Sequence, residues 1–277
     1  MIREFILTNA KDVSWSFNRP EYCILYEPEG LGYEEQATYK RLGTRWASED
    51  PEAQQAEITG EIIFSGGDPY AAYRAFGRFL NDAPLVLTYT TDAGTVYRDV
   101  AAAKIEKREK KEYFLLRCRI SLVCTSLWYE LTTAQQLGEP AILTDATPDQ
   151  LTDAAGNLLT TTEPNYTVLN DGDTPAPFTL SMNGQTDHPT LTVTDENGNK
   201  KTVTFPVELE ATDTLHYSSI DGDLYCYLED EDGTETNLVP LFPVGSNIFL
   251  KIPTGLAGVE VLGSNIQLSF RQEYKRA

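Results

Sequence analysis

Basic residues and histidines are scarce in this sequence. Its 277 residues include 22 lysines and arginines against 42 aspartates and glutamates, a net charge of −20, and only two histidines. A chain so acidic lacks the basic surface that nucleic acid or an anionic membrane requires. Neither His188 nor His216 lies in a recognisable ligand or base motif, and no G-x-S-x-G elbow is present. We therefore expect no enzyme active site, no metal and no cofactor.

Long apolar runs and clustered cysteines are also missing. No segment approaches the roughly 20 apolar residues that a membrane helix needs, and the first residues, MIREFILTNAKD, lack the apolar stretch of a signal peptide. This favours a soluble chain synthesised in a cytoplasm. The four cysteines are too scattered for a C-x-x-C motif. Cys118 and Cys124 fall on the apolar face of an alternating segment, which predicts that they are small core residues.

The acidity is concentrated in the second half of the chain. Residues 1–135 carry 16 basic and 20 acidic residues, net −4, whereas residues 136–277 carry 6 and 22, net −16. Helix signals also vanish from about residue 131, where Thr, Asp, Asn and Gly begin to dominate. The length alone favours two domains. We predict one domain over 1–130 and a second over 131–277.

The first domain is expected to be mostly β, sandwich-like, with a single helix over 69–81. Asp68 is a suitable N-cap and Pro69 suits the first helical position. Tyr73, Phe76 and Leu80 then recur at helical spacing with Phe79 alongside, which predicts an aromatic stripe packed on a sheet. The expected strands cover 56–66, 83–91, 95–109 and 111–125.

A long segment over 27–55 interrupts this pattern. It has little periodicity and is rich in Gly, Pro and charge, so it is predicted to be a long loop or arm. Tyr39 and Trp46 within it favour an ordered arm that meets a partner subunit. Together with Phe79 on the helix, these two aromatics are the candidate interface residues.

The second domain shows the signs of an antiparallel β-sandwich or jelly roll. The segments 191–205 and 223–239 each alternate around a turn dipeptide, Asn197-Gly198 and Asp232-Gly233, which predicts two hairpins. Further strands are expected over 178–182, 246–255 and 258–274. The proline-rich stretch LNDGDTPAP before Phe178 is predicted to be an entry turn into this sandwich.

Two kinds of ligand site are conceivable in the second domain. The acidic turns DGDT (171–174) and DGDL (221–224) can contribute carboxylates to a metal site, but they form turns without one, and LEDEDGTETNLV fails the EF-hand pattern. Tyr217, Tyr225 and Tyr227 are candidates for an aromatic platform that stacks on sugar rings. They are equally candidates for the core.

The order of these elements resembles a known family, the distal tail proteins of long-tailed bacteriophages. The resemblance rests on the turn SGGDPY before the helix and on the strand EYFLLRCRISLVCTSLWYE that closes the first domain. It rests further on NDGDTPAPFTLSMNGQTDHPTLTV and on GSNIFLKIPTGLAGVEV in the second domain. The arm over 27–55 departs from the family, in which this segment is often shorter or differently composed.

The resemblance implies a structural hub in the virion tail tip. The first domain would form a six-membered ring around a channel, alone or as a back-to-back dodecamer, and the second would be a galectin-like or carbohydrate-binding-module-like sandwich on its periphery. The implied partners are copies of the chain, a tail tube protein, a tail-tip protein and a receptor-binding protein. The alternatives are a carbohydrate-binding adhesion protein and, third, a glycoside hydrolase, which would need two suitably spaced carboxylates.

Overall fold

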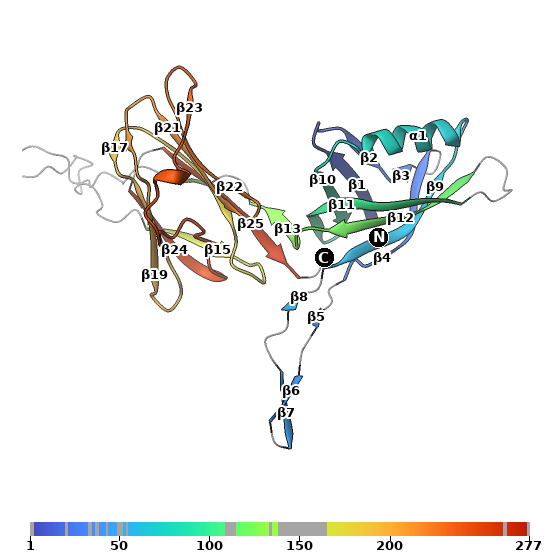
Figure 1. The fold of residues 1–277 in the computed structure, drawn as a ribbon, viewed down its shortest axis with the longest axis horizontal. Helices are drawn as coiled ribbons and strands as arrows, with labels where there is room; N and C mark the ends of the chain where they lie inside the picture. Colours follow the sequence, from blue (N-terminus) through green and yellow to red (C-terminus); the bar gives the residue numbers. More distant parts are fainter. Residues whose placement is uncertain are drawn as a thin grey trace, which may run out of the picture. The chain divides into compact units, whose positions relative to one another are not determined.

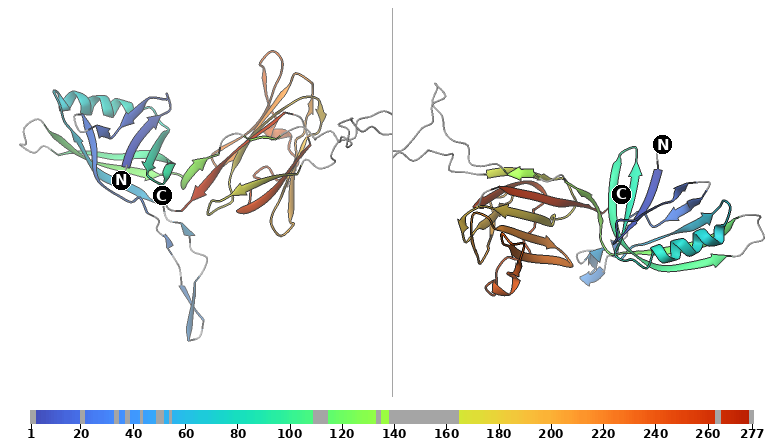
Figure 2. Two further views of the ribbon diagram at one scale, coloured as in Figure 1. Left: turned by 180° about the vertical axis from the view of Figure 1, so that it is seen from behind. Right: turned by 90° about the horizontal axis from the view of Figure 1, so that it is seen from above.

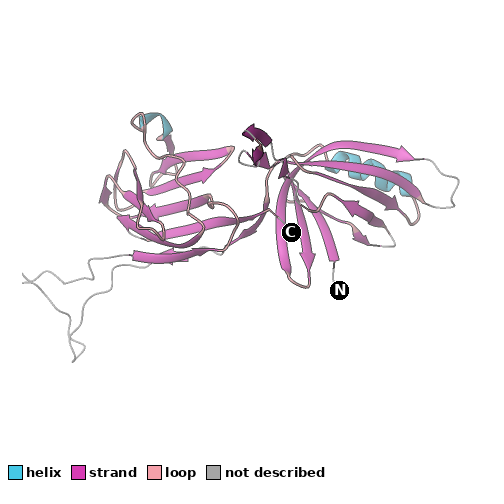
Figure 3. Cartoon of the chain, turned by 90° about the horizontal axis from the view of Figure 1, so that it is seen from below, coloured by secondary structure: helices cyan, strands magenta, loops and turns pink. Residues whose placement is uncertain are grey.

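A computed structural model describes residues 3–19, 22–32, 35–36, 39–42, 44–48, 52–53, 55–108, 115–132, 135–137, 165–262 and 265–275. It divides into two compact units, unit 1 with residues 1–130 and 274–277, and unit 2 with residues 131–273. Both consist almost entirely of antiparallel strands (Figure 3). The described part of the chain has no helix long and apolar enough to cross a membrane.

The described part of unit 1 combines a curved sheet with one helix (Figure 1). The helix is α1 (Pro69–Phe79). The strands of unit 1 are β1 (Arg3–Asn9), β2 (Ser14–Ser16), β3 (Asn18–Arg19), β4 (Cys23–Glu29), β9 (Glu57–Phe64), β10 (Leu85–Thr91), β11 (Gly94–Arg108), β12 (Leu116–Cys124) and β13 (Trp128–Leu131).

The strand path of unit 1 returns to its starting point. Strands pair in the order β2, β1, β10, β11, β12, β9, β4, β3, and β2 and β3 are consecutive pieces of the segment 14–19. The long strand β11 takes part in both halves, because its first residues pair with β10 and its last with β12 across a bulge between Ala102 and Lys104. Such closure leaves few free strand edges and encloses one core.

Helix α1 lies against this sheet and completes its core, as the view from above in Figure 2 shows. Asp68 caps it by accepting a hydrogen bond from the Ala71 amide, 2.9 Å away. The ring of Phe76 is fully buried, with its centroid 5.0 Å from that of Trp15 and 5.8 Å from that of Phe64. The predicted aromatic stripe is therefore present and faces the sheet.

Alternation along β12 places its apolar residues inside. Leu116, Cys118, Ile120, Leu122 and Cys124 are all buried, whereas the residues between them are partly or fully exposed. The two cysteines are thus core residues, as predicted. Burial raises the pKa of the Cys118 thiol to about 11.

The predicted arm contains paired strands. They are β5 (Glu35–Gln36), β6 (Tyr39–Leu42), β7 (Arg45–Ser48) and β8 (Glu52–Ala53), with β5 paired to β8 and β6 to β7. The arm begins at Gly30, whose positive φ of 84° and close approach to the Glu57 backbone leave no room for a Cβ atom. The sequence predicted a long loop or arm here without its strands, because the paired strands are short and show no alternation of apolar residues.

Unit 2 is a β-sandwich. Its strands are β14 (Gln135–Leu137), β15 (Asn165–Asn170), β16 (Phe178–Asn183), β17 (Thr186–Asp187), β18 (Thr190–Thr194), β19 (Lys200–Thr204), β20 (Glu208–Leu209), β21 (Thr214–Ile220), β22 (Asp223–Glu229), β23 (Glu235–Asn237), β24 (Gly255–Leu262) and β25 (Ile266–Tyr274), with a 3₁₀ turn, η1 (Val239–Leu241).

Two sheets enclose the core of unit 2. One contains β23, β22, β21, β16, β25 and β14, and the other contains β15, β24, β18 and β19. The core includes Phe178, Phe205, Tyr217 and Leu250. The two predicted hairpins are present as β18–β19 and β22–β23. The likeness to galectins stays a prediction.

The proline-rich stretch before β16 is the connection between the two sheets. It leaves β15 of one sheet at Asn170 and enters β16 of the other at Phe178. The Asn170 side chain is 1% exposed, and its amide donates to the carbonyls of Thr174 (3.0 Å) and Ile252 (3.1 Å). A buried amide thus holds the corner of the sandwich, which explains why a rigid turn precedes the strand.

The predicted strand over 246–255 is wrong. The amide of Ile248 donates to Ser246 and that of Leu250 to Asn247, so the segment satisfies its backbone through local turns. Only Ile252 makes a bridge, to Ala176, and β24 begins at Gly255. Pro253 lacks the N–H donor that a continuous ladder would need there.

Candidate functional site

An aromatic row lies on the outer face of β21 and β22 in unit 2. His216 is the cross-strand neighbour of Tyr227, and their rings stack at 4.7 Å with an angle of 17°. Tyr225 follows on the same face, 5.6 Å from Tyr227. All three are half-buried, and His216 Nε2 lies 3.1 Å from the Glu229 carboxylate. We call His216, Tyr225 and Tyr227 the aromatic row.

Tyr217 is not part of this surface, which corrects its place in the predicted platform. Successive residues of a strand face opposite sides, so Tyr217 points into the sandwich while His216 points out. It is 1% exposed and packs against Phe178 and Phe205 at 5.5 and 5.3 Å. Its hydroxyl donates to the Ile248 carbonyl at 2.7 Å, and burial raises the phenol's pKa. Tyr217 is a core residue.

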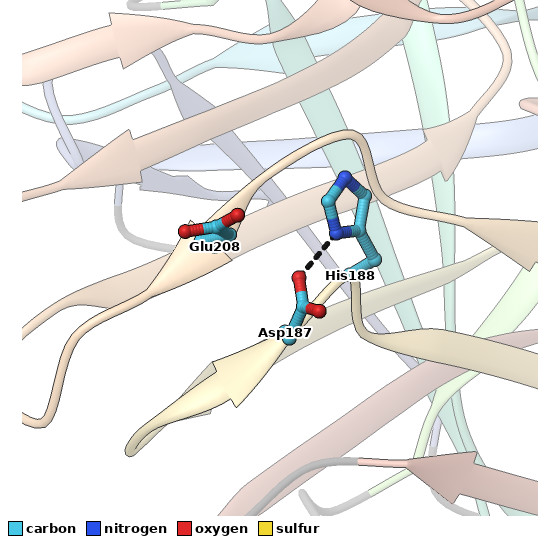
Figure 4. Close-up of side chains that lie close together, drawn as sticks. All are labelled: Asp187, His188 and Glu208. Atoms are coloured by element: carbon cyan, nitrogen blue, oxygen red, sulfur yellow. Dashed lines mark hydrogen bonds and ion pairs between the residues drawn. The ribbon is translucent and has the colours of Figure 1, made fainter.

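A second group of polar side chains was missed by sequence reasoning. Asp187, His188 and Glu208 offer ligand atoms that all lie within 4.8 Å of one another, and Asp187 pairs with His188 Nδ1 (Figure 4). Pairing of β17 with β20 sets Asp187 opposite Glu208, which brings residues 21 positions apart together. A carboxylate and imidazole set of this kind suits a transition metal, although all three side chains are exposed.

The acidic turns considered in the sequence do not contribute to that group. Among the described residues, Asp187, His188 and Glu208 are the group of possible metal ligands that lies close together, and neither 171–174 nor 221–224 takes part in it. Asp173 lies in the sandwich corner, where its amide donates to Glu273 at 2.7 Å. Asp221 pairs with Lys251. In both stretches the Asp and Gly residues are accounted for as turn formers.

Among the described residues, both units also have sizeable pockets of mixed character. In unit 2, about 390 Å³ is lined by residues that include Phe249, Asp195, Lys201 and Lys251, and Phe249 is 62% exposed. In unit 1, about 440 Å³ is lined by Arg98, by the turn 124–127, and by Gln55 and Ala56. The cavity of unit 2 described first is lined in part by residues of the segment 246–255, which the sequence had predicted to be a strand.

The three candidate interface residues differ in what the structure shows of them. Tyr39 and Trp46 lie on the arm, where β6 and β7 set Tyr39 opposite Ser48 and Trp46 opposite Arg41. Phe79 is 7% exposed, and its ring lies 5.9 Å from that of Trp15 and 6.0 Å from that of Phe76. Phe79 is therefore corrected from an interface candidate to a core residue, because the helix turns it toward the sheet.

The fold of the whole chain matches solved structures of phage tail components. A chain of the activated baseplate of phage P2 with calcium superposes with a TM-score of 0.72 at 15% identity, covering 100% of both chains. The strontium form of that baseplate gives 0.71 at 15%, again over 100% of both chains. The Dit protein of phage SPP1 gives 0.64 at 10% identity over 97% of this chain and 98% of that one. No curated protein matches the chain.

These likenesses, at such low identity, define the fold: a mostly β, two-unit protein of the kind found in phage baseplates. A family model matches part of the sequence. Residues 4–125 match the model described as distal tail protein, N-terminal domain, which confirms the predicted resemblance over that part of the chain.

Proposed function

We propose that copies of this chain close into a ring that serves as the hub between the tail tube and the tail tip of a phage. The observation that carries the proposal is the match of residues 4–125 to the distal tail N-terminal domain. When one face of a subunit binds a different face of the next copy, the copies form a ring if the rotation between neighbours adds up to a full turn. The family resemblance supplies the number six and the back-to-back dodecamer as a second arrangement.

The arm suits a contact between copies. Residues 39–48 include Lys40, Arg41 and Arg45 and no acidic residue, in a chain whose net charge is −20. Lys40, Arg41 and Arg45 are exposed. Basic residues at the end of an arm are complementary to the acidic surface that any neighbouring copy offers. Tyr39 and Trp46 belong to the same hairpin, and aromatic residues are enriched at the centres of interfaces.

The ring is tested by the mass of the purified full chain from light scattering after size exclusion, with negative-stain images. We expect six or twelve copies and ring-shaped particles. Trp46→Ala and the double variant Lys40→Glu, Arg45→Glu should reduce assembly. Lys11→Glu is the control, since Lys11 is an exposed surface residue of unit 1. A strict monomer at high concentration, also in the presence of tail partners, would refute the ring.

The remaining partners follow from the hub role. The ring would bind a tail tube protein on one side and a tail-tip protein on the other, and unit 2 would be the docking platform for a receptor-binding protein. The role is structural and not enzymatic, and the protein would be synthesised in the host cytoplasm and carried in the virion. Antibody labelling of intact particles should decorate the distal end of the tail, and labelling elsewhere would contradict this place.

Carbohydrate binding by unit 2 is the second candidate function, and the aromatic row favours it. Tyr225 and Tyr227 are half-buried with ring centroids 5.6 Å apart, and His216, which stacks on Tyr227, lies beside the Glu229 carboxylate. Binding to a glycan array should be lost in Tyr225→Ala and Tyr227→Ala and retained in Tyr166→Ala, a half-buried tyrosine on the other sheet. No binding by the wild-type protein to any glycan would dismiss this function.

A further inference from the structure

Unit 1 buries an arginine on the inner face of a strand. Arg98 on β11 is 5% exposed and follows the alternation that also buries Val100. Its neighbour Asp99 faces the other side and accepts a hydrogen bond from the Tyr129 hydroxyl at 2.8 Å. Arginine is rarely buried without an anionic partner, so the surroundings of Arg98 are informative.

The described residues satisfy the guanidinium only in part. Nε donates to the Ser126 carbonyl at 3.0 Å, and Cζ lies 5.2 Å from the Trp128 ring centroid. Nη1 is buried and has no hydrogen-bond acceptor among the described residues. Burial lowers the pKa of Arg98, and no carboxylate contributes to the opposite shift. The cation–π contact offsets part of the lost hydration but supplies no acceptor.

A cavity that is widely open to solvent lies beside this arginine. Its volume is about 440 Å³, large enough for a carboxylate side chain, and Arg98 is the charged residue of its lining. Thr125 from the turn after β12 and Gln55 from the end of the arm add a hydroxyl and an amide to it. All three side chains can donate hydrogen bonds to an oxygen anion.

We propose that this cavity is a carboxylate-binding site, and that an Asp or Glu side chain of a second copy of the chain fills it. The planar guanidinium fork matches a carboxylate in geometry as well as charge. The site adjoins the base of the arm through Gln55 and Ala56. A second copy that contacts the base of the arm can therefore also contact Arg98. The inference thus rests on the proposed ring.

A second copy is the occupant that the charge favours. Two chains of net charge −20 repel each other over most of their surfaces. A buried cation without an anion is a place where contact between such chains is favourable, and the 42 acidic residues of each copy provide many carboxylates. Only a correctly docked copy would place a carboxylate at Arg98. The ion pair would therefore favour one arrangement of neighbouring copies over others.

The test compares self-association of the full-length wild type with that of Arg98→Met and Arg98→Lys by sedimentation velocity over a concentration series. We expect Arg98→Met to weaken association by about 30-fold or more, because the neighbour's carboxylate is left unpaired. Arg98→Lys, which keeps the charge but loses the fork, should fall between the two. Lys11→Met is the matched control, since it removes one exposed positive charge from unit 1.

Thermal unfolding of the dilute subunit separates this role from a structural one. If Arg98 acts on the neighbour, Arg98→Met leaves the melting temperature of the subunit unchanged or raises it. If it only supports the fold, the melting temperature falls while association is unchanged, and the inference is overturned. Should Arg98→Met fail to fold, Arg98→Lys carries the same comparison.

Sodium acetate, compared with sodium chloride at equal ionic strength, separates a neighbour's side chain from a free carboxylate. We expect acetate to compete and to dissociate wild-type assemblies but not those of Arg98→Lys to the same extent. Acetate that stabilises the wild-type subunit without affecting association would show a small-molecule site and overturn the second copy as occupant. A ring that persists unchanged in Arg98→Met refutes this inference alone, whereas a monomeric wild type refutes the proposed function and the inference with it.

Discussion

Replacing Asn170 by alanine should destabilise unit 2 while leaving unit 1 unchanged. Asn170 is 1% exposed at the corner where the chain passes from one sheet of the sandwich to the other. Its amide donates to the carbonyls of Thr174 and Ile252, and its Oδ1 accepts from the Gly172 amide at 3.1 Å. Alanine removes these hydrogen bonds and a longer one from the same amide to the Pro253 carbonyl at 3.3 Å.

The expected loss is about 3 kcal/mol. A hydrogen bond of this kind contributes about 1 kcal/mol net, and a buried group left without a partner costs about 1–3 kcal/mol more. The Ile252 carbonyl keeps a second donor, the Ala176 amide at 2.7 Å. The cost of the groups left without a partner is therefore near the lower end of that range. For a unit of this size, such a change lowers the melting temperature by about 10 °C.

The tryptophans allow each unit to be followed separately. All three, Trp15, Trp46 and Trp128, belong to unit 1, so tryptophan fluorescence reports the unfolding of unit 1 and calorimetry reports both units. The control is Asn183→Ala, an exposed asparagine at the end of β16, whose effect should stay within about 0.5 kcal/mol.

Two results would refute this reasoning. A melting temperature of unit 2 in Asn170→Ala within a degree or so of the wild type would show that the corner does not depend on these bonds. An equal shift of the tryptophan transition would show that the units unfold together, and the loss would then not belong to unit 2.

Three further predictions concern the cores and one half-buried acid. Phe76→Ala should cost unit 1 about 3–5 kcal/mol, measured as an earlier tryptophan transition in urea, because it removes the ring that contacts Trp15 at 5.0 Å; an unchanged midpoint contradicts this. The four cysteines are free and buried, and burial raises the pKa of the Cys226 thiol to about 12, so the native protein should not react with a thiol reagent at pH 8 and should react fully when unfolded; rapid native labelling contradicts it. Burial raises the pKa of Glu273 above its ordinary value of 4.5, so protonated Glu273 favours the folded state at low pH, and that contribution is lost as the pH rises through the raised pKa. Glu273→Gln should therefore show a flatter decline of unit 2 stability above pH 4.5 than the wild type, and parallel curves would contradict the shift.

Local signals predicted the elements whose residues are close together in the chain. Asp68 and Pro69 mark the start of α1, and the turn dipeptides Asn197-Gly198 and Asp232-Gly233 mark the two hairpins of unit 2. The alternation in β12 identified its buried face. Each of these features depends on interactions within a few residues, which periodicity records directly.

Periodicity failed where pairing or facing depends on distant residues. Tyr217 and Tyr225 differ by an even number of positions but lie on different strands, and only the register between β21 and β22 turns one inward and the other outward. The alternating segment 246–255 has an apolar pattern suited to a strand, yet its neighbours leave it a single bridge at Ile252. Sequence pattern does not show whether a partner strand is within reach.

The sequence by itself therefore determined the mostly β fold class, helix α1, the hairpins of unit 2 and the resemblance of residues 4–125 to a distal tail domain, because these depend on composition, local periodicity and characteristic motifs. Only the tertiary structure decided which side chains face solvent and which groups meet. It joined Asp187 to Glu208, retained Tyr225 and Tyr227 at the surface, buried Phe79, and left Arg98 beside a cavity. Those arrangements depend on the register between distant strands and on which side chains fit into the limited volume of the core. Neither can be read from a short stretch of residues.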